Sequence, residues 1–211
     1  MIDESINHSY PWVSTCGKDP VMPKIGMEPV RREALVRATI SEIGQAGSLD
    51  VTVSQIARRA GMSSALAHHY FGGKAQIFLA AMRHILTEFG AEVRCELAAA
   101  PKHLRAEAII RASFAPASFE KESIGAWMTF YVLAQTDAQA LRLWRLYQRR
   151  LRSNLVHALR PVCPAPVDAA DTLAALIDGL YIRAALHDPE APDVARDHAL
   201  RVLAMLKDQP A

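Results

Sequence analysis

The sequence has few cysteines, and it lacks any long apolar run. Its three cysteines, Cys16, Cys95 and Cys163, are odd in number and widely separated, without the spacing of metal ligands. This pattern argues against a disulfide framework and a metal site, and it favours a reducing cytoplasm as the location. No apolar run approaches the ~18 residues that cross a bilayer, so no membrane partner is expected.

Catalytic motifs are missing as well. The chain has no Ser-His-Asp order, no phosphate-binding loop and no paired carboxylates, and its histidines are scattered apart from the pair His68-His69. Enzymes need such groups within reach of one another, so the sequence argues against catalysis and indicates no cofactor.

Net charge is small, but it is unevenly distributed. The whole chain carries +2, whereas seven basic and four acidic residues between Lys24 and Lys74 give that segment +3. Hydrophobic residues make up 51% of the chain and charged residues 22%, a balance typical of a globular protein. A basic segment on a nearly neutral body suits a protein that meets a polyanion with one end.

Helical periodicity dominates the sequence once the first residues are passed. Residues 1–21 are polar and show no period, so we expect a disordered N-terminal extension, consistent with an overlong gene start and Met22 as the natural first residue. The spacing of apolar residues then predicts helices over 30–46, 53–60, 64–71 and 74–99. Beyond Pro101 every segment has helical period and none alternates with period two, so the predicted fold class is all-α.

The segment from Thr52 to Lys74 has the signals of a helix-turn-helix unit. Thr52 and Gln55 are spaced as a capping box at the start of the first short helix. Gly61 permits a sharp turn, and Ser63 can cap the second short helix. The second helix of such a unit fits the major groove, so double-stranded operator DNA is the predicted partner.

This segment strongly resembles the signature of the TetR family of transcriptional repressors. The resemblance is carried by Thr52, Ile56-Ala57, Ala60-Gly61-Met62-Ser63 and Tyr70-Phe71 with Lys74. It implies an N-terminal three-helix DNA-binding domain, joined by a long helix to a helical ligand-binding and dimerisation domain. A homodimer reading two half-sites is expected, because one recognition helix contacts too few bases for useful specificity.

The resemblance also implies roles for individual residues of the motif. The positions that reach bases are Ser54, Ser64, Ala65, Leu66 and His68. Side-chain chemistry and the same resemblance make phosphate anchors of Thr52, Ser63, His69, Tyr70 and Lys74. The family usually has glycine where Ala65 stands and tyrosine where His68 stands, so the operator sequence cannot be carried over from relatives.

Two later segments, 138–160 and 168–187, are apolar on more than one face. Helices of this kind must bury more than one face, either in the core of one chain or against a second copy. Because the last large helices of the family pair across a two-fold axis, we favour the dimer. The dimer-interface candidates are Leu151, Leu155, Leu173, Leu176, Ile177, Gly179, Leu180 and Ala184.

A closer resemblance, to the BetI-type repressors within that family, spans roughly residues 22–206 and is weakest over 101–124. Besides the helix-turn-helix, it is carried by residues 22–32, 149–156 and 173–186. In that group choline relieves repression of the genes for choline uptake and glycine betaine synthesis. The resemblance therefore implies a DNA-binding domain over 22–75 and a ligand-sensing and dimerisation domain over 76–211.

A choline-like effector needs aromatic faces and a nearby carboxylate, because a quaternary ammonium is bound through cation–π attraction. The ligand-binding candidates are Trp127, Phe130, Tyr131, Trp144, Tyr147, Asp178 and Tyr181. Trp127 and Phe130 also fit an ordinary core, and Asp178 could pair with an arginine such as Arg183. A TetR-type repressor of a different small amphipathic or cationic ligand is the alternative. In either case the long helix that begins at Lys74 would be the lever between ligand and DNA.

Overall fold

The computed structural model describes residues 26–186 and 191–208, and within these ranges it contains helices and no strand. This confirms the predicted all-α class; the extension predicted over 1–21 lies outside the described residues. The helices are α1 (Met27–Ala46), α2 (Val53–Arg59), α3 (Ser64–Phe71), α4 (Lys74–Ala99), α5 (Arg105–Ser113), α6 (Lys121–Thr136), α7 (Ala138–Leu159), α8 (Pro166–Ala185) and α9 (Ala191–Lys207), with 3₁₀ turns at Lys102–Leu104 (η1) and Pro116–Phe119 (η2).

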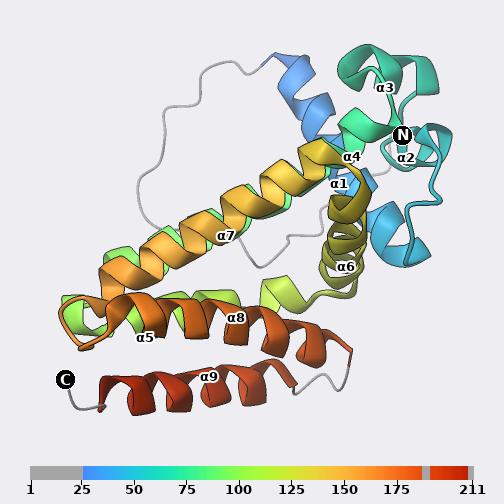
Figure 1. The fold of residues 1–211 in the computed structure, drawn as a ribbon. Helices are drawn as coiled ribbons and strands as arrows, with labels where there is room; N and C mark the ends of the chain where they lie inside the picture. The colour runs from blue at the N-terminus through green and yellow to red at the C-terminus, as the bar shows by residue number, and fades with distance from the viewer. Residues whose placement is uncertain (1–25, 187–190, 209–211) are drawn as a thin grey trace, which may run out of the picture.

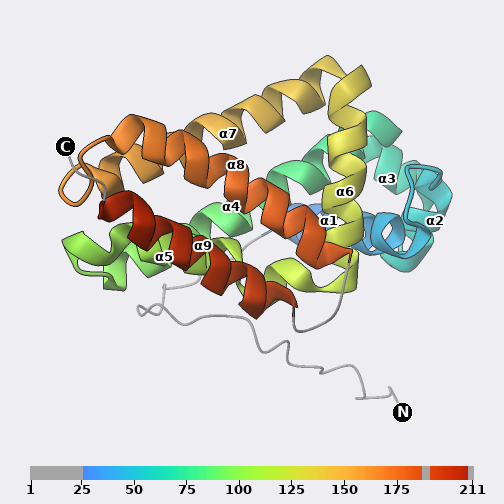
Figure 2. The ribbon, with the colours of Figure 1, turned by 60° about the horizontal axis from the view of Figure 1, so that its bottom comes forward.

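The short helices α2 and α3 gather with α1 at one end of the molecule (Figure 1). The long helices α4 and α7 run away from this end, and α8 packs between α7 and α9 (Figures 1 and 2). Helix α6 crosses back to lie against α1 in both views. The N-terminal unit is therefore joined to the rest through α6 as well as through α4.

Two hydrophobic cores follow this division. The smaller contains Leu35, Ile56 and Ala67 from α1, α2 and α3, and it also takes in Ala126 from α6. The start of α4 adds Ile77 and Phe78 to this core, whereas Leu79 and Met82 further along the helix belong to the larger one. One helix thus passes from one core into the other without a break.

Helix α1 begins earlier than the sequence predicted. The apolar pattern suggested a start at Val30, whereas the helix begins at Met27 and contains Pro29 in its first turn. Proline is tolerated there because the first N–H groups of a helix have no partner within it. The predicted stop is confirmed: Gly47 has φ of 61° and its N–H donates to the carbonyl of Ile43.

Candidate functional site

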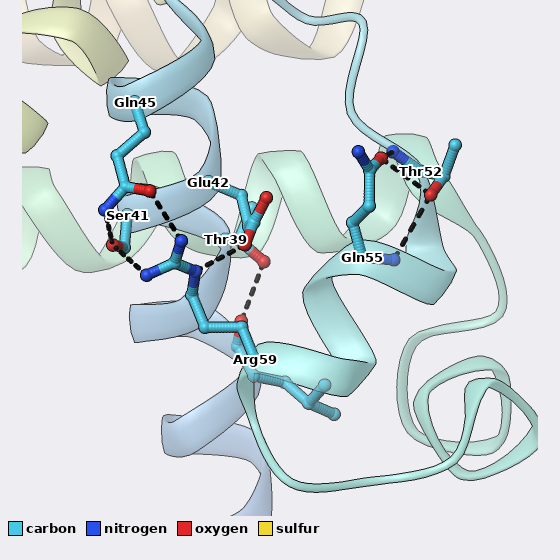
Figure 3. Close-up of polar contacts among 8 residues, drawn as sticks. Thr39, Ser41, Glu42, Gln45, Thr52, Gln55 and Arg59 are labelled. Atoms are coloured by element: carbon cyan, nitrogen blue, oxygen red, sulfur yellow. Dashed lines mark hydrogen bonds and ion pairs between the residues drawn. The ribbon is translucent and has the colours of Figure 1, made fainter.

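The helix-turn-helix begins with the capping box that the sequence predicted (Figure 3). The Gln55 N–H donates to the Thr52 hydroxyl oxygen at 3.2 Å, and the Thr52 N–H donates to Gln55 Oε1 at 2.7 Å. The Thr52 hydroxyl donates to the same Oε1 at 2.7 Å. The proton of Thr52 that would anchor a phosphate therefore already has an acceptor within the cap.

The turn between α2 and α3 is built as expected. Gly61 has φ of 67°, in the left-handed region that favours glycine. The N–H of Leu66 donates to the Ser63 hydroxyl oxygen at 3.2 Å, which caps α3 and leaves the Ser63 hydroxyl proton available.

Two of the predicted base-facing residues meet in space. The Ser64 hydroxyl donates to the Ser54 hydroxyl oxygen at 3.0 Å, which links α3 to α2. Ala65 and His68 are exposed on α3, and one ring nitrogen of His68 lies 3.1 Å from the carbonyl oxygen of Gly72. Leu66 is half-buried. The predicted set thus occupies neighbouring turns of α2 and α3.

The predicted phosphate anchors lie around the same helix pair. His69 and Lys74 are exposed, and Lys74 opens α4 with its Nζ 5.4 Å from the Phe78 ring centroid. Tyr70 is half-buried, with its ring centroid 5.4 Å from the guanidinium of Arg32. Tyr70 therefore also contributes to holding α3 against α1.

Helix α1 holds both helices of the motif through two arginines that the sequence reasoning missed. Arg32 on α1 donates from Nη1 to the Tyr70 carbonyl at 2.5 Å. Arg59 on α2 forms an ion pair with Glu42 of α1 (Figure 3). The run Arg58-Arg59 was visible in the sequence, but nothing local showed that the second arginine turns toward α1.

The predicted ligand residues gather in the larger core. Trp127 on α6 lies centrally, with ring centroids 5.6 Å from Phe130, 5.7 Å from Tyr131 and 5.3 Å from Tyr147 of α7. Phe89 of α4, which the sequence reasoning missed, lies 5.8 Å from Tyr147. We call Phe89, Trp127, Phe130, Tyr131 and Tyr147 the aromatic cluster.

A half-buried carboxylate lies beside the aromatic cluster. Asp178 of α8 accepts a hydrogen bond from the Tyr147 hydroxyl at 3.1 Å and another from Gln148 Nε2 at 2.5 Å. Burial raises the pKa of Asp178, and the two hydrogen bonds oppose that rise. Burial likewise raises the pKa of Tyr147, and the nearby Asp178 charge adds to the effect.

The remaining two tyrosines differ in how their hydroxyls are used. The Tyr181 hydroxyl donates to the Ser118 carbonyl at 2.8 Å, and its ring lies 4.9 Å from that of Phe119. The Tyr131 hydroxyl is buried without a hydrogen-bond partner in the described part of the chain. Burial raises its pKa, the nearby Asp178 charge raises it further and the Trp127 indole beside it opposes the rise, so the hydroxyl stays protonated and can donate.

Trp144, the last ligand candidate, lies half-buried on α7 one turn before Tyr147. Its indole nitrogen is buried without a hydrogen-bond partner among the described residues. On the same helix, a surface groove of about 470 Å³ is lined by Ala138, Arg142, Arg145, Gln148 and Arg149. Because three arginines line this groove, it suits an anion better than a cation.

The residues predicted to form the dimer interface fall into two groups that differ in burial. Leu176 and Leu180 are half-buried, and Gly179 is exposed, with no atom within 4 Å of the position that a Cβ would take. The other five candidates are buried in the core of the chain itself, which leaves Leu176, Gly179 and Leu180 as the candidates with surface to offer a second copy. These five are Leu151, Leu155, Leu173, Ile177 and Ala184.

Over residues 26–186 and 191–208, no helix is long and apolar enough to cross a membrane. Over the same residues, no group of three histidine, cysteine, aspartate or glutamate side chains is placed to hold a metal ion.

Known proteins match the chain along nearly its whole described length. Residues 35–81 match the family of bacterial regulatory proteins of the tetR family, and residues 101–207 match the family described as BetI-type transcriptional repressor, C-terminal. The HTH-type transcriptional regulator BetI of Brucella suis biovar 1 is 51% identical over 197 residues, covering 90% of this chain and 98% of the relative.

Solved structures share the fold at lower identity. A transcriptional regulator from Pseudomonas aeruginosa PAO1 superposes with a TM-score of 0.75 at 23% identity, covering 87% of this chain and 93% of that one. A transcriptional regulator from Saccharomonospora viridis, crystallised in complex with choline, gives a TM-score of 0.71 at 19% identity and covers 83% of this chain and 96% of that one. The capped helix-turn-helix, the two family matches and the identity to BetI establish that this chain belongs to the BetI-type transcriptional repressors of the TetR family.

Proposed function

We propose that this repressor binds, as a homodimer, the operator of genes for choline uptake and glycine betaine synthesis, and that choline releases it. The observation that carries the proposal is the half-buried Asp178 beside the aromatic cluster, in a chain of the BetI type. The site of action would be the cytoplasm, where bacterial chromosomal DNA lies.

The chemistry of the site supports a small organic cation. Aromatic faces attract a quaternary ammonium through cation–π interactions, and these grow stronger where water is excluded. Asp178 receives its hydrogen bonds from neutral donors, Tyr147 and Gln148, so a bound cation would supply the opposite charge. The Tyr131 hydroxyl could donate to the hydroxyl of choline, which would satisfy a buried group that otherwise has no partner.

The two parts of the chain take the two roles that this proposal requires. We assign DNA binding to residues 22–75 and ligand sensing with dimerisation to residues 76–211. Within the first unit, the exposed turns of α2 and α3 would contact bases, with Lys74 on a phosphate.

A dimer contact centred on Gly179 explains an otherwise unfavourable residue. Glycine weakens a helix interior, and no atom of its own chain approaches Gly179 closely enough to require it. A helix from a second copy could approach the backbone there, flanked by Leu176 and Leu180. The exposed pair Arg152–Asp171, which joins α7 to α8, would lie at the rim of such a contact.

The decisive experiment measures binding of the purified protein to its own promoter by fluorescence anisotropy, with and without choline. We expect choline to weaken operator binding by roughly 5–150-fold, the usual range of allosteric coupling. Glycine betaine and tetramethylammonium serve as controls for the hydroxyl and for the cationic group. Operator binding that ignores choline but responds to another cation would favour a different effector for the same fold.

A further inference from the structure

Helices α1 and α6 touch backbone to backbone where Gly44 meets Gly125. A Cβ on Gly44 would lie 2.4 Å from the Cα and 2.6 Å from the carbonyl oxygen of Glu122. A Cβ on Gly125 would lie 2.7 Å from the Cα of Gly44. All of these neighbours are backbone atoms, so no side chain can rotate away, and only glycine fits at either position.

On one side of this contact, α1 is tied to the helix-turn-helix within a turn of Gly44. Arg59 of α2 reaches back to three residues on that turn, and Figure 3 shows its guanidinium held between them. Its partners on α1 are Ser41 at 3.1 Å, Gln45 at 2.6 Å and the carboxylate of Glu42. Arg32, near the other end of α1, holds the Tyr70 carbonyl of α3 at 2.5 Å. Any displacement of α1 at Gly44 is therefore passed to both DNA-contacting helices.

On the other side, α6 carries the centre of the aromatic cluster immediately after Gly125. Trp127 follows two residues later, and Tyr131 one turn further on. The Thr129 hydroxyl donates to the Gly125 carbonyl at 2.7 Å, inside the same helical segment. A shift of Trp127 thus moves the backbone at Gly125, and no flexible side chain lies between that backbone and α1.

We propose that the Gly44–Gly125 contact is the joint through which ligand binding on α6 repositions the helix-turn-helix. This inference rests on the proposed function for the identity of the ligand. In this scheme the shift caused by the ligand passes from α6 through α1 to α2, in addition to the path along α4 that the sequence suggested. Gly44 and Gly125 are positioning residues in this scheme, and they touch neither ligand nor DNA.

The test compares Gly44→Ala and Gly125→Ala with Gly90→Ala in the full chain. Gly90 lies within α4, and an added Cβ there would meet only the end of the flexible Arg94 side chain, at 3.3 Å. All three changes replace glycine by alanine within a helix, but only the first two force backbones apart. Calorimetric titration with choline and anisotropy with operator DNA measure the two binding steps separately.

We expect choline affinity close to wild type in all three variants. Operator affinity without choline should fall by roughly 5–150-fold in Gly44→Ala and Gly125→Ala, and choline should then weaken operator binding little further. Gly90→Ala should match the wild type throughout. If both joint variants bind the operator and release it with choline as the wild type does, the joint is overturned while the proposed function stands.

A measurement on the wild type covers the case in which the variants fail to fold. Hydrogen–deuterium exchange should show that choline changes the protection of amides over 41–46 together with those over 121–127. Unchanged protection over 41–46, with altered protection over 121–127, would overturn the joint. If the wild type does not bind choline at all, the proposed function fails, and wild-type operator affinity in the folded Gly44→Ala and Gly125→Ala variants would overturn the joint as well.

Discussion

Tyr147 of α7 donates a partly buried hydrogen bond to Asp178 of α8, with 3.1 Å between the hydroxyl oxygen and Oδ1. Burial raises the pKa of both groups, and at Asp178 the hydrogen bonds from Gln148 and Tyr147 oppose that rise. A cation placed beside them would lower the pKa of Asp178 and strengthen its hold on both donors. The pair therefore provides a sensitive test for the charge of the ligand.

Asp178→Asn should weaken choline binding by at least about tenfold, which corresponds to about 1.4 kcal/mol. The amide has nearly the same shape as the carboxylate, and its oxygen can still accept the hydrogen bond from Tyr147. Its NH2 group faces Gln148, whose side-chain amide must turn to present Oε1, so the change removes mainly the charge. Calorimetric titration measures the effect. Asp171→Asn, at the exposed partner of Arg152, is the matched control and should leave choline affinity unchanged. Equal choline affinity in Asp178→Asn and wild type would rule out a charge role for Asp178.

Tyr131→Phe should reduce the preference for choline over tetramethylammonium, which lacks the hydroxyl. Loss of one neutral hydrogen bond costs about 0.5–1.5 kcal/mol, so choline affinity should fall roughly two- to twelvefold while tetramethylammonium affinity is unchanged. Competition titrations measure both ligands. Tyr181→Phe is the control, because its hydroxyl is committed to the Ser118 carbonyl. If Tyr131→Phe keeps the preference for choline, a different residue must form the hydrogen bond to the choline hydroxyl.

His84→Gln should lower thermal stability more at pH 6 than at pH 8. His84 of α4 lies 3.1 Å from Glu88 and 3.6 Å from Glu33 of α1, with Arg37 close by. The hydrogen bond to Glu88 is the main cause of its raised pKa, and burial and Arg37 oppose the rise. Because the pKa of His84 is raised by folding, its contribution to the free energy of unfolding is fully present below the pKa of the unfolded chain, 6.5. This contribution is lost as the pH rises through the pKa of His84 in the folded protein.

Melting curves at the two pH values measure this link between α1 and α4. The pKa of Glu88 is lowered, chiefly by the hydrogen bond from His84, so its contribution is lost only as pH falls well below neutrality. His103→Gln, at an exposed position before α5, is the control and should have little effect at either pH. An equal loss of stability at pH 6 and pH 8 in His84→Gln would mean that packing, and not charge, accounts for its role.

Lys74→Ala should weaken operator binding and flatten its salt dependence. Each phosphate contact contributes about 0.9 to the slope of log affinity against log salt, so a dimer should lose about 1.8. Anisotropy titrations between low and moderate salt measure the slope. Lys102→Ala, an exposed lysine in η1 at the far end of α4, should leave the slope unchanged. An unaltered slope in Lys74→Ala would remove its phosphate role.

Thr52→Ala should act on stability more than on DNA contacts. The Thr52 hydroxyl both accepts from the Gln55 N–H and donates to Gln55 Oε1, so its loss uncaps α2 at a cost of about 1 kcal/mol. Chemical denaturation measures this cost. The salt slope of operator binding should stay at the wild-type value, and a reduced slope would restore the predicted phosphate contact of Thr52.

The sequence was most informative where structure depends on neighbouring residues. Thr52, Gln55, Gly61 and Ser63 specify caps and a turn through hydrogen bonds and φ values within a few residues, and all four were read correctly. Pro29 was the exception at this scale, because its place in the first turn of α1 allowed an earlier start than the apolar pattern implied.

Longer-range relationships were accessible only in part. Periodicity showed that Leu155 and Leu173 lie on apolar faces, but it could not show that those faces meet within one chain. The donor Gln148 lies 30 residues from Asp178, and Phe89 comes from a different helix, so neither had a local signal. The candidate aromatics themselves were predicted from composition and resemblance, and the structure places Trp127, Phe130, Tyr131 and Tyr147 together.

The close approach of α1 and α6 also determines which positions can be varied when the ligand specificity is redesigned. Glycine is the smallest residue, so every substitution at Gly44 or Gly125 inserts atoms between two backbones. Libraries for new biosensors should therefore leave these two positions constant and vary the side chains around Trp127. A repertoire of sensors for different cations could then share a single, unaltered output module.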